Sequence, residues 1–386
     1  MSSQTSYARG VAEKIERTIR LLRDLGRTAD AEPGKVIRWV RAESERRCAD
    51  GDSAYLGDLG VELLQCHRAE PRAWQYLHTF DHLFKLLAGV CGNGDLSQAL
   101  RLIAAGRDAG HDIDRLAAAL LVAEGPRTGL AAAVEGSGDD GDTFRACLVH
   151  ELVLREGTLA RRPRIAEWAS SAAMRRHPLG WLPLELAGFE AGWDQGPPTI
   201  GEADREIRVA PGERPAWPAT DVSTQAVADA VSAAVLNWAE DSNGEIEARV
   251  FDLGEAVTPE NILEALAGLG LQCLEAGSVP FRLAVFGVEA YVAWWILFHA
   301  ALDGSAYGRG RHGAYSRLFA WRSLAALAGA AEGASPQEVW ERAQQCTWFG
   351  FDAESPWYTH VFWDIGLVAV RPGGESLAVL AATDTD

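Results

Sequence analysis

Apolar residues recur every three or four positions from Tyr7 to about Gly192, with short breaks at Gly, Pro and Asp or Asn clusters. This spacing is typical of amphipathic helices. We therefore expect helices joined by short turns, over residues 36–47, 53–67, 71–91, 95–107, 111–123, 143–155 and 164–176. Helices of similar length connected in this way favour stacked hairpins, as in solenoids. No fixed sequence period is visible, so an irregular helical array is an equally good interpretation.

A different pattern begins at residue 194. Residues 194–223 contain five prolines, which stop helices and favour extended chain. We predict a Pro-rich linker here, or else a long segment that wraps one domain. The flanking domains are expected to be a helical array over residues 1–193 and a second domain over residues 224–386. Two domains are expected because 386 residues exceed what one hydrophobic core usually spans.

The last third of the chain combines helical and strand patterns. Residues 245–253 alternate apolar and polar side chains, which predicts a strand. Strands are also expected at 359–370 and 376–381, because Arg371-Pro372-Gly373-Gly374 between them is strong turn sequence. Helices are expected over residues 224–241, from Thr258 onward, and over 281–302, 315–328 and 335–346. The second domain is therefore predicted to be a small, mainly antiparallel sheet covered by helices, and the fold class to be α+β.

The net charge of −18 argues against simple electrostatic binding of nucleic acid, because an acidic body repels phosphates. A basic protein is a more natural partner for such a chain. The basic residues are almost all Arg, with Lys only at Lys14, Lys35 and Lys85. This bias indicates a GC-rich bacterial genome.

Several features bear on the cellular compartment. The six cysteines have no CxxC spacing, which favours free, buried thiols over disulfides. The first residues lack a basic start followed by an apolar stretch, so no signal peptide is expected. Residues 284–302 are apolar enough to suggest a membrane span, but they contain Glu289 and His299. We expect a buried helix there, no membrane association, and a cytoplasmic protein.

The most informative polar cluster follows this apolar stretch. His299 and Asp303 share one helix face, and a Gly-rich loop with Arg309, Arg311 and His312 comes directly after them. Gly-rich backbone leading into a helix N-terminus, with Arg nearby, can hold an anion. These residues are therefore the candidate ligand site, although no Walker or Rossmann spacing is present. The favoured interpretation is nevertheless structural, with Arg317 and Arg322 pairing with acids of the last segment.

Two other polar features are weaker candidates. Glu289 is a carboxylate amid apolar residues, and burial would raise its pKa and suit it to general acid or base work. A hydrogen bond from a Trp indole or an Arg is the more common arrangement for such a group. His78 and His82 could clasp a metal on one helix face, but no third ligand is indicated. We predict no metal and no cofactor.

Five short runs near the C-terminus carry a resemblance to a family. They are Ala320-Trp321-Arg322-Ser323-Leu324, Trp357-Tyr358, Phe362-Trp363-Asp364-Ile365-Gly366, Arg371-Pro372-Gly373-Gly374, and Leu380-Ala381-Ala382-Thr383-Asp384-Thr385-Asp386. With them, mainly residues 225–386 resemble an uncharacterised actinobacterial domain-of-unknown-function family. The resemblance implies a bacterial source, and it brings no activity and no catalytic residue.

Without a catalytic motif, we predict an intracellular protein-binding protein, with an interaction or immunity-like role against a possibly basic partner protein. The irregular helical array and the acidic charge favour this interpretation. The alternative is an enzyme, or a small-anion or nucleotide-binding protein, with its site in the C-terminal domain at His299, Asp303, Arg309, Arg311, His312 and Glu289. Whether the protein is an enzyme, and its oligomeric state, stay open at this point.

Overall fold

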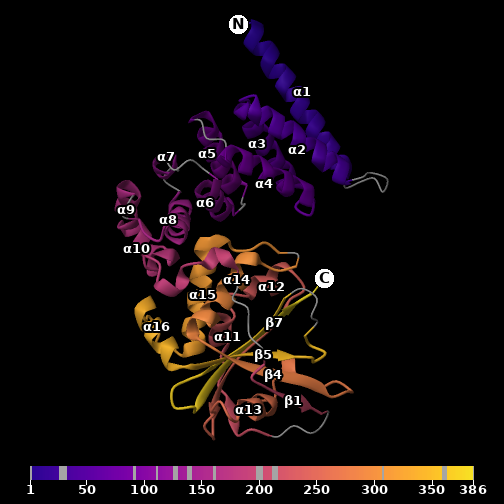
Figure 1. Ribbon diagram of the computed structural model, residues 1–386. Coiled ribbons are helices and arrows are strands. Elements are labelled where there is room, and N and C mark those ends of the chain that lie inside the picture. The colour runs from indigo at the N-terminus through magenta and orange to yellow at the C-terminus, as the bar shows by residue number, and fades with distance from the viewer. Residues whose placement is uncertain are drawn as a thin grey trace. The chain divides into compact units, whose positions relative to one another are not determined.

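The computed structural model describes residues 2–25, 33–89, 93–109, 112–124, 129–136, 141–159, 162–196, 203–210, 216–306, 308–358 and 363–385. The chain divides into two compact units, Met1–Gly180 and Trp181–Asp386. The first unit is helical and the second combines helices with a sheet, which confirms the α+β fold class (Figure 1). None of the helices in the described ranges has the length and apolar content needed to cross a membrane.

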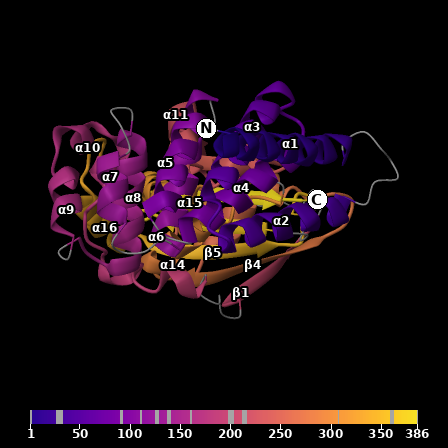
Figure 2. The ribbon, with the colours of Figure 1, turned by 90° about the horizontal axis from the view of Figure 1, so that it is seen from above.

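The helices of the first unit stack in two layers. The odd-numbered helices α1, α3, α5, α7 and α9 pack on one another in sequence, and α2, α4, α6 and α8 do the same. Figure 2 shows α1 alongside α3 in this arrangement. The helix bounds are α1 Ser2–Leu25, α2 Pro33–Ala49, α3 Ser53–Ala69, α4 Trp74–Gly89, α5 Asn93–Asp108, α6 Ile113–Glu124, α7 Leu130–Gly136, α8 Asp142–Glu156, α9 Pro163–Ala169 and α10 Ala172–Arg176.

Contacts between alternate helices show how many residues separate matching positions of successive helical hairpins. Arg41 of α2 contacts His78 of α4, 37 residues later. The Cys48 thiol lies near the carbonyl of Leu86, 38 residues later. In the other layer, Arg101 of α5 pairs with Asp58 of α3, 43 residues earlier. The helices therefore stack as in a solenoid, and the varying step explains why no fixed period is visible in the sequence.

The second unit is built on one seven-stranded sheet in the order β1-β4-β5-β6-β7-β3-β2. Every neighbouring pair of strands is antiparallel. The strand bounds are β1 Arg205–Val209, β2 Ala219–Asp221, β3 Glu245–Leu253, β4 Phe281–Val288, β5 Thr347–Ala353, β6 Trp363–Val370 and β7 Ser376–Asp384. The helix bounds are α11 Gln225–Val231, α12 Leu236–Asp241, α13 Ile262–Gly268, α14 Ala290–Asp303, α15 His312–Ala328 and α16 Pro336–Gln345.

Both faces of this sheet are covered. On one face, Phe251, Leu283, Phe351 and Val379 pack with the apolar side chains of α13 in a continuous core. On the other face, α14 packs on β5, and α15 packs on β6 and β7. Burial on both faces explains why several strands have no alternating pattern of apolar and polar residues.

Strand β4 corrects one sequence-based expectation. A single helix was expected over residues 281–302, but Phe281–Val288 is a strand and α14 begins only at Ala290. β4 lies between β1 and β5 and is apolar on both faces, and periodicity alone cannot distinguish such a run from a buried helix. Strand β5 was also not predicted. The strand over 245–253 is confirmed at those bounds, and the hairpin around Arg371–Gly374 is confirmed as β6 and β7.

The Pro-rich segment 194–223 contributes both edges of the sheet. Within it, β1 pairs with β4 and β2 pairs with β3, while residues 197–202 and 211–215 lie outside the described ranges. The division between the two units falls earlier, after Gly180. The start of the expected terminal hairpin, residues 359–362, also lies outside the described residues.

The two units differ sharply in charge. Residues 1–180 contain 25 Lys and Arg and 25 Asp and Glu, so this unit is neutral. Residues 181–386 contain 11 Lys and Arg and 29 Asp and Glu, so the whole net charge of −18 belongs to the second unit. A partner attracted by net charge alone would therefore be attracted to the second unit.

Candidate functional site

The structure brings only part of the predicted polar cluster together. His299 is buried, with 7% of its surface exposed, and its Nδ1 lies 3.6 Å from Asp303 Oδ2. Its Nε2 is buried without a hydrogen-bond partner. Arg311 instead turns to α12, where its Nη2 lies 2.6 Å from Glu240 Oε2. Glu289 is exposed at the start of α14, and ten residues of helix place it about 15 Å from His299.

Backbone N–H groups of the loop between α14 and α15 donate hydrogen bonds to other groups of the protein. The amide of Ala306 donates to the buried Asp384 carboxylate, which also accepts from Ser242 Oγ at 2.9 Å. The amide of Gly308 donates to Ser305 Oγ at 2.7 Å, and the amide of Arg311 donates to the carbonyl of Ala301 at 2.8 Å. Since these N–H groups are already bonded within the protein, they are not free to hold an anion.

The other two predicted residues of this loop, Arg309 and His312, are part of the packed connection itself. The carbonyl of Arg309 accepts a 3.5 Å hydrogen bond from Asn237 Nδ2. His312 begins α15 with a φ of 59°, a backbone conformation that few residues other than Gly adopt. A Cβ at Gly310 would clash with the carbonyl of Leu302 near the end of α14. Only glycine therefore allows the loop to pack this closely on α14. The loop is therefore a tightly packed connection.

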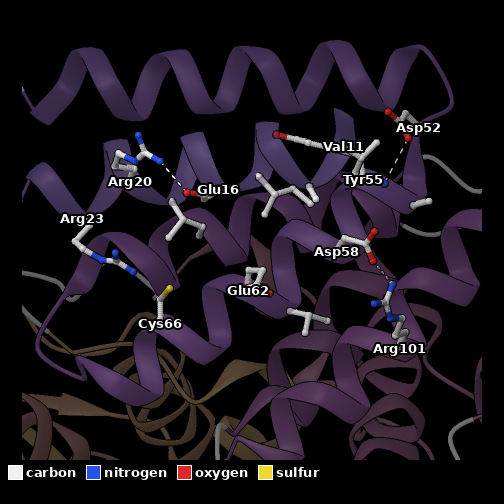
Figure 3. Close-up of a pocket in the computed structure, with 15 residues that line it drawn as sticks. Val11, Glu16, Arg20, Arg23, Asp52, Tyr55, Asp58, Glu62, Cys66 and Arg101 are labelled. Atoms are coloured by element: carbon white, nitrogen blue, oxygen red, sulfur yellow. Dashed lines mark hydrogen bonds and ion pairs between the residues drawn. The ribbon is translucent and has the colours of Figure 1, made fainter. Parts of the chain in front are cut away.

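The first unit contains a groove that sequence reasoning did not identify. It lies over α3 between α1 and α5 and has a volume of about 630 Å³ (Figure 3). It is lined by Val11, Ala12, Ile15, Glu16, Ile19, Arg20, Arg23, Asp52, Ala54, Tyr55, Asp58, Val61, Glu62, Cys66 and Arg101. The α1 residues among these recur every three or four positions, so they form one face of that helix.

The groove exists because α3 packs closely on α5 but leaves space between itself and α1. Toward α5, α3 presents Gly57 and Gly60, and a Cβ at Gly60 would lie only 2.8 Å from Leu102 Cδ2. These glycines allow α3 and α5 to pack closely. Toward α1, α3 presents the larger Tyr55 and Val61, and the space left between the helices is the groove. The three-residue spacing of the two glycines was the signal in the sequence that could have revealed this asymmetry.

Seven charged side chains are among the described residues that line the groove, and five of them form ion pairs. Glu16 pairs with Arg20 at 2.8 Å and Asp58 with Arg101 at 2.7 Å. Asp52 pairs with Arg47 at 2.6 Å, and Arg23 lies beside Cys66 (Figure 3). Glu62 is exposed between Cys66 and Asp58 (Figure 3), and the described residues offer it no ion-pair or hydrogen-bond partner.

Cys66 contributes a thiol to the described lining of the groove. Burial raises the pKa of its thiol, although the nearby Arg23 guanidinium acts in the opposite direction. A thiol with a raised pKa stays protonated near neutral pH and is a poor nucleophile. Cys66 is therefore not placed as an activated nucleophile in this groove.

His78 and His82 each contact α2. Arg41 Nη2 lies 2.6 Å from His78 Nε2, and His82 Nε2 lies 3.4 Å from Glu45 Oε1. Burial lowers the pKa of His82. No group of three or more metal-ligating side chains occurs among the residues that the structure describes.

The model of a family of unknown function, DUF6183, matches residues 38–386. The chain belongs to this family. Comparisons with curated proteins and with solved structures found no match. The DUF6183 match begins within α2 and includes the whole second unit, so it extends well beyond the C-terminal resemblance seen in the sequence. Of the helices around the groove, α3 and α5 lie inside the match and α1 precedes it.

Proposed function

We propose that this protein is an interaction protein whose helical unit binds a segment of another protein in the groove between α1, α3 and α5. The observation that carries this proposal is the combination of an apolar floor with one acid, Glu62, that has no ion-pair partner among the described residues. Val11 and Val61 are half-buried and supply apolar surface that a partner could cover, while Ile15 and Ile19 are buried beneath them at 7% exposure. Stacked helical hairpins in general present such extended binding surfaces.

The partner segment is an amphipathic helix that places a Lys or Arg opposite Glu62. An apolar groove between helices accepts the apolar face of such a helix through residues spaced three and four apart. The other acids of the rim, Glu16, Asp52 and Asp58, are already paired, so Glu62 is the acid that a basic side chain on the partner would complement. This role fits an interaction or immunity-like protein acting against a partner with a basic recognition segment.

The alternative function, an enzyme or a small-anion or nucleotide-binding protein with its site around His299 and Arg311, has less support. The N–H groups of Ala306, Gly308 and Arg311 are bonded internally, and Arg311 pairs with Glu240. We therefore place the anion-binding alternative second.

We also propose that the protein acts in the cytoplasm of an actinobacterium. The Arg-rich, Lys-poor composition supports the source. Cys66, Cys147, Cys273 and Cys346, among the described residues, form no disulfide, which suits a reducing compartment.

Capture experiments with matched variants test the groove. The full-length protein and its Glu62→Lys, Val61→Asp and Asp108→Lys variants are immobilised and exposed to extract from the producing strain, at low and high salt. Asp108 is an exposed acid at the end of α5 and does not line the groove, so it is the charge-matched control. We expect a protein retained by the wild type and by Asp108→Lys but lost from both groove variants. Equal capture by all four proteins, or no capture by the wild type, contradicts the proposal.

A further inference from the structure

Strand β3 is covered by β2 over only part of its length. β2 pairs with the last residues of β3, from Asp221 opposite Phe251 to Ala219 opposite Leu253. The chain continues one residue further, with the amide of Val222 donating to the carbonyl of Val250 at 2.9 Å. It then turns away, because Thr224 caps the start of α11. Within the described ranges, no strand pairs with the first half of β3 on this side, and its edge is open there.

The hydrogen bonds establish which residues face that edge. The amide of Leu253 donates to Glu375, toward β7, whereas Gly254 donates to Pro218 and Val250 accepts from Val222, on the side of β2. Backbone groups alternate in direction along a strand. Ile246 and Ala248 therefore turn their N–H and C=O groups to the open edge, and the described part of the chain provides no backbone partner for them there.

A groove of about 380 Å³ runs along this edge. It lies between α11 and α12 on one side and Gln272 on the other, and all four residues from Ile246 to Arg249 line it. Leu236 of α12 contributes apolar surface and is 37% exposed. Unpaired strand edges beside a helix form the usual geometry for a peptide that joins a sheet as an extra strand.

The charges around the groove favour a basic peptide over an acidic one. Arg249, which is the one basic side chain among the described residues that line the groove, already contacts Asp221 at 3.3 Å and Glu247 at 3.4 Å. Asp229 lines the groove and Glu245 begins the same strand, and both are exposed acids. The whole unit has 29 acidic against 11 basic residues, which attracts a basic segment and repels an acidic one.

We propose that the open edge of β3 binds an extended, basic peptide segment of another protein, which adds to the sheet in line with β2. A helix cannot occupy this edge in the same way, because its own N–H and C=O groups are bonded internally. This site is separate from the groove of the helical unit and does not depend on it.

The test uses the full-length protein and a labelled six-residue peptide that alternates Lys and Val, with blocked ends. The key variant is Ala248→Pro, which removes the edge-facing N–H. Proline is tolerated where the N–H does not belong to the ladder, so the variant should fold with an unchanged melting temperature. The matched control Ala248→Val keeps the N–H. We expect saturable binding, weakened more than tenfold by Ala248→Pro and within about twofold of wild type in Ala248→Val.

A second arm tests the peptide backbone and remains informative if Ala248→Pro fails to fold. Two sets of peptides are N-methylated at alternate residues. One set lacks the N–H groups that would face β3, and the other lacks those that would face away from it. Only the first set should lose binding. The proposal is overturned if both sets bind equally, if Ala248→Pro folds and binds as the wild type does, or if no saturable binding occurs. Equal binding of a Glu-Val peptide overturns the basic character of the occupant.

Discussion

Glu190 and Arg317 form an ion pair that is completely buried in the second unit, with both side chains 0% exposed. Arg317 Nε donates to Glu190 Oε1 at 2.7 Å and Nη2 donates to Oε2 at 2.8 Å. The guanidinium also donates to the carbonyls of Pro183 and Glu185, and the Trp321 indole donates to Glu190 at 2.9 Å. These bonds tie the segment after Trp181 to helix α15.

Removing one partner of this pair should be strongly destabilising. In Arg317→Met the Glu190 carboxylate stays buried without its guanidinium, which costs about 3–5 kcal/mol. Urea unfolding of the full-length protein, followed by the fluorescence of the buried Trp residues of the second unit, measures this loss. Arg322→Ala, an exposed Arg on the same helix, should stay within about 0.5 kcal/mol of wild type. A loss below about 1 kcal/mol in Arg317→Met would show that the pair does not hold the unit together.

The same pair predicts where the second unit begins. A fragment of residues 181–386 retains Glu190, β1 and β2, and we expect it to fold as an independent piece. A fragment of residues 224–386 leaves Arg317 buried without its acid and exposes both β4 and β3 as new edges. Circular dichroism and heteronuclear NMR of the two fragments compare these expectations. A well-folded 224–386 fragment would mean that residues 194–223 act as a linker after all.

Close packing of α3 on α5 provides a third prediction. Gly60→Leu places a side chain against the buried Leu102, and overpacking of this kind costs about 1–3 kcal/mol. Gly10→Leu is the matched control, because a Cβ at Gly10 meets no atom within 4 Å. Replacing this helical glycine should stabilise the helix by about 0.5–1 kcal/mol. Thermal unfolding of both variants should give shifts of opposite sign, and shifts of the same sign would contradict the packing asymmetry that creates the groove.

Glu43 gives the helical unit a defined pH dependence. Hydrogen bonds from Arg46 and Arg47 lower the pKa of Glu43 from 4.5 to about 2, against a smaller opposing effect of burial. Because the folded pKa is depressed, its stabilisation is present above pH 4.5 and is lost as the pH falls toward 2. The difference in melting temperature between wild type and Glu43→Gln should therefore shrink steadily below about pH 4.5. A difference that stays constant across this range would show that Glu43 does not titrate as described.

The sequence predicted those elements whose signals are local. The hairpin of β6 and β7 is marked by the turn at Arg371–Gly374, and β3 by its own alternation. Strands β1 and β2 are short, at five and three residues, and lie among prolines, so nothing local identifies them. The acid that pairs with Arg317 was expected in the last segment, but Glu190 lies 127 residues before it, and only the tertiary fold brings the two together.

The candidate sites show the same limit. The residues around His299 formed the candidate ligand site because they are close in sequence and chemically distinctive. In the structure, most of their polar groups hold a loop together. The groove depends on three helices and on two small residues, Gly57 and Gly60, that look ordinary in a helical sequence. The open edge of β3 depends on where β2 ends, which is a matter of strand pairing and not of residue type.

Photo-crosslinking in the producing cells tests the proposed binding groove most directly. A photoreactive residue placed at Val61 lies inside the groove beside Glu62, whereas the same residue at Asp108 lies outside it. We predict a crosslinked partner at position 61 whose attached peptide is an amphipathic segment containing Lys or Arg, and no such product at position 108. The product should disappear when Glu62→Lys is added. Equal crosslinking at both positions, or none at position 61, would contradict the assignment of this groove as the partner-binding site.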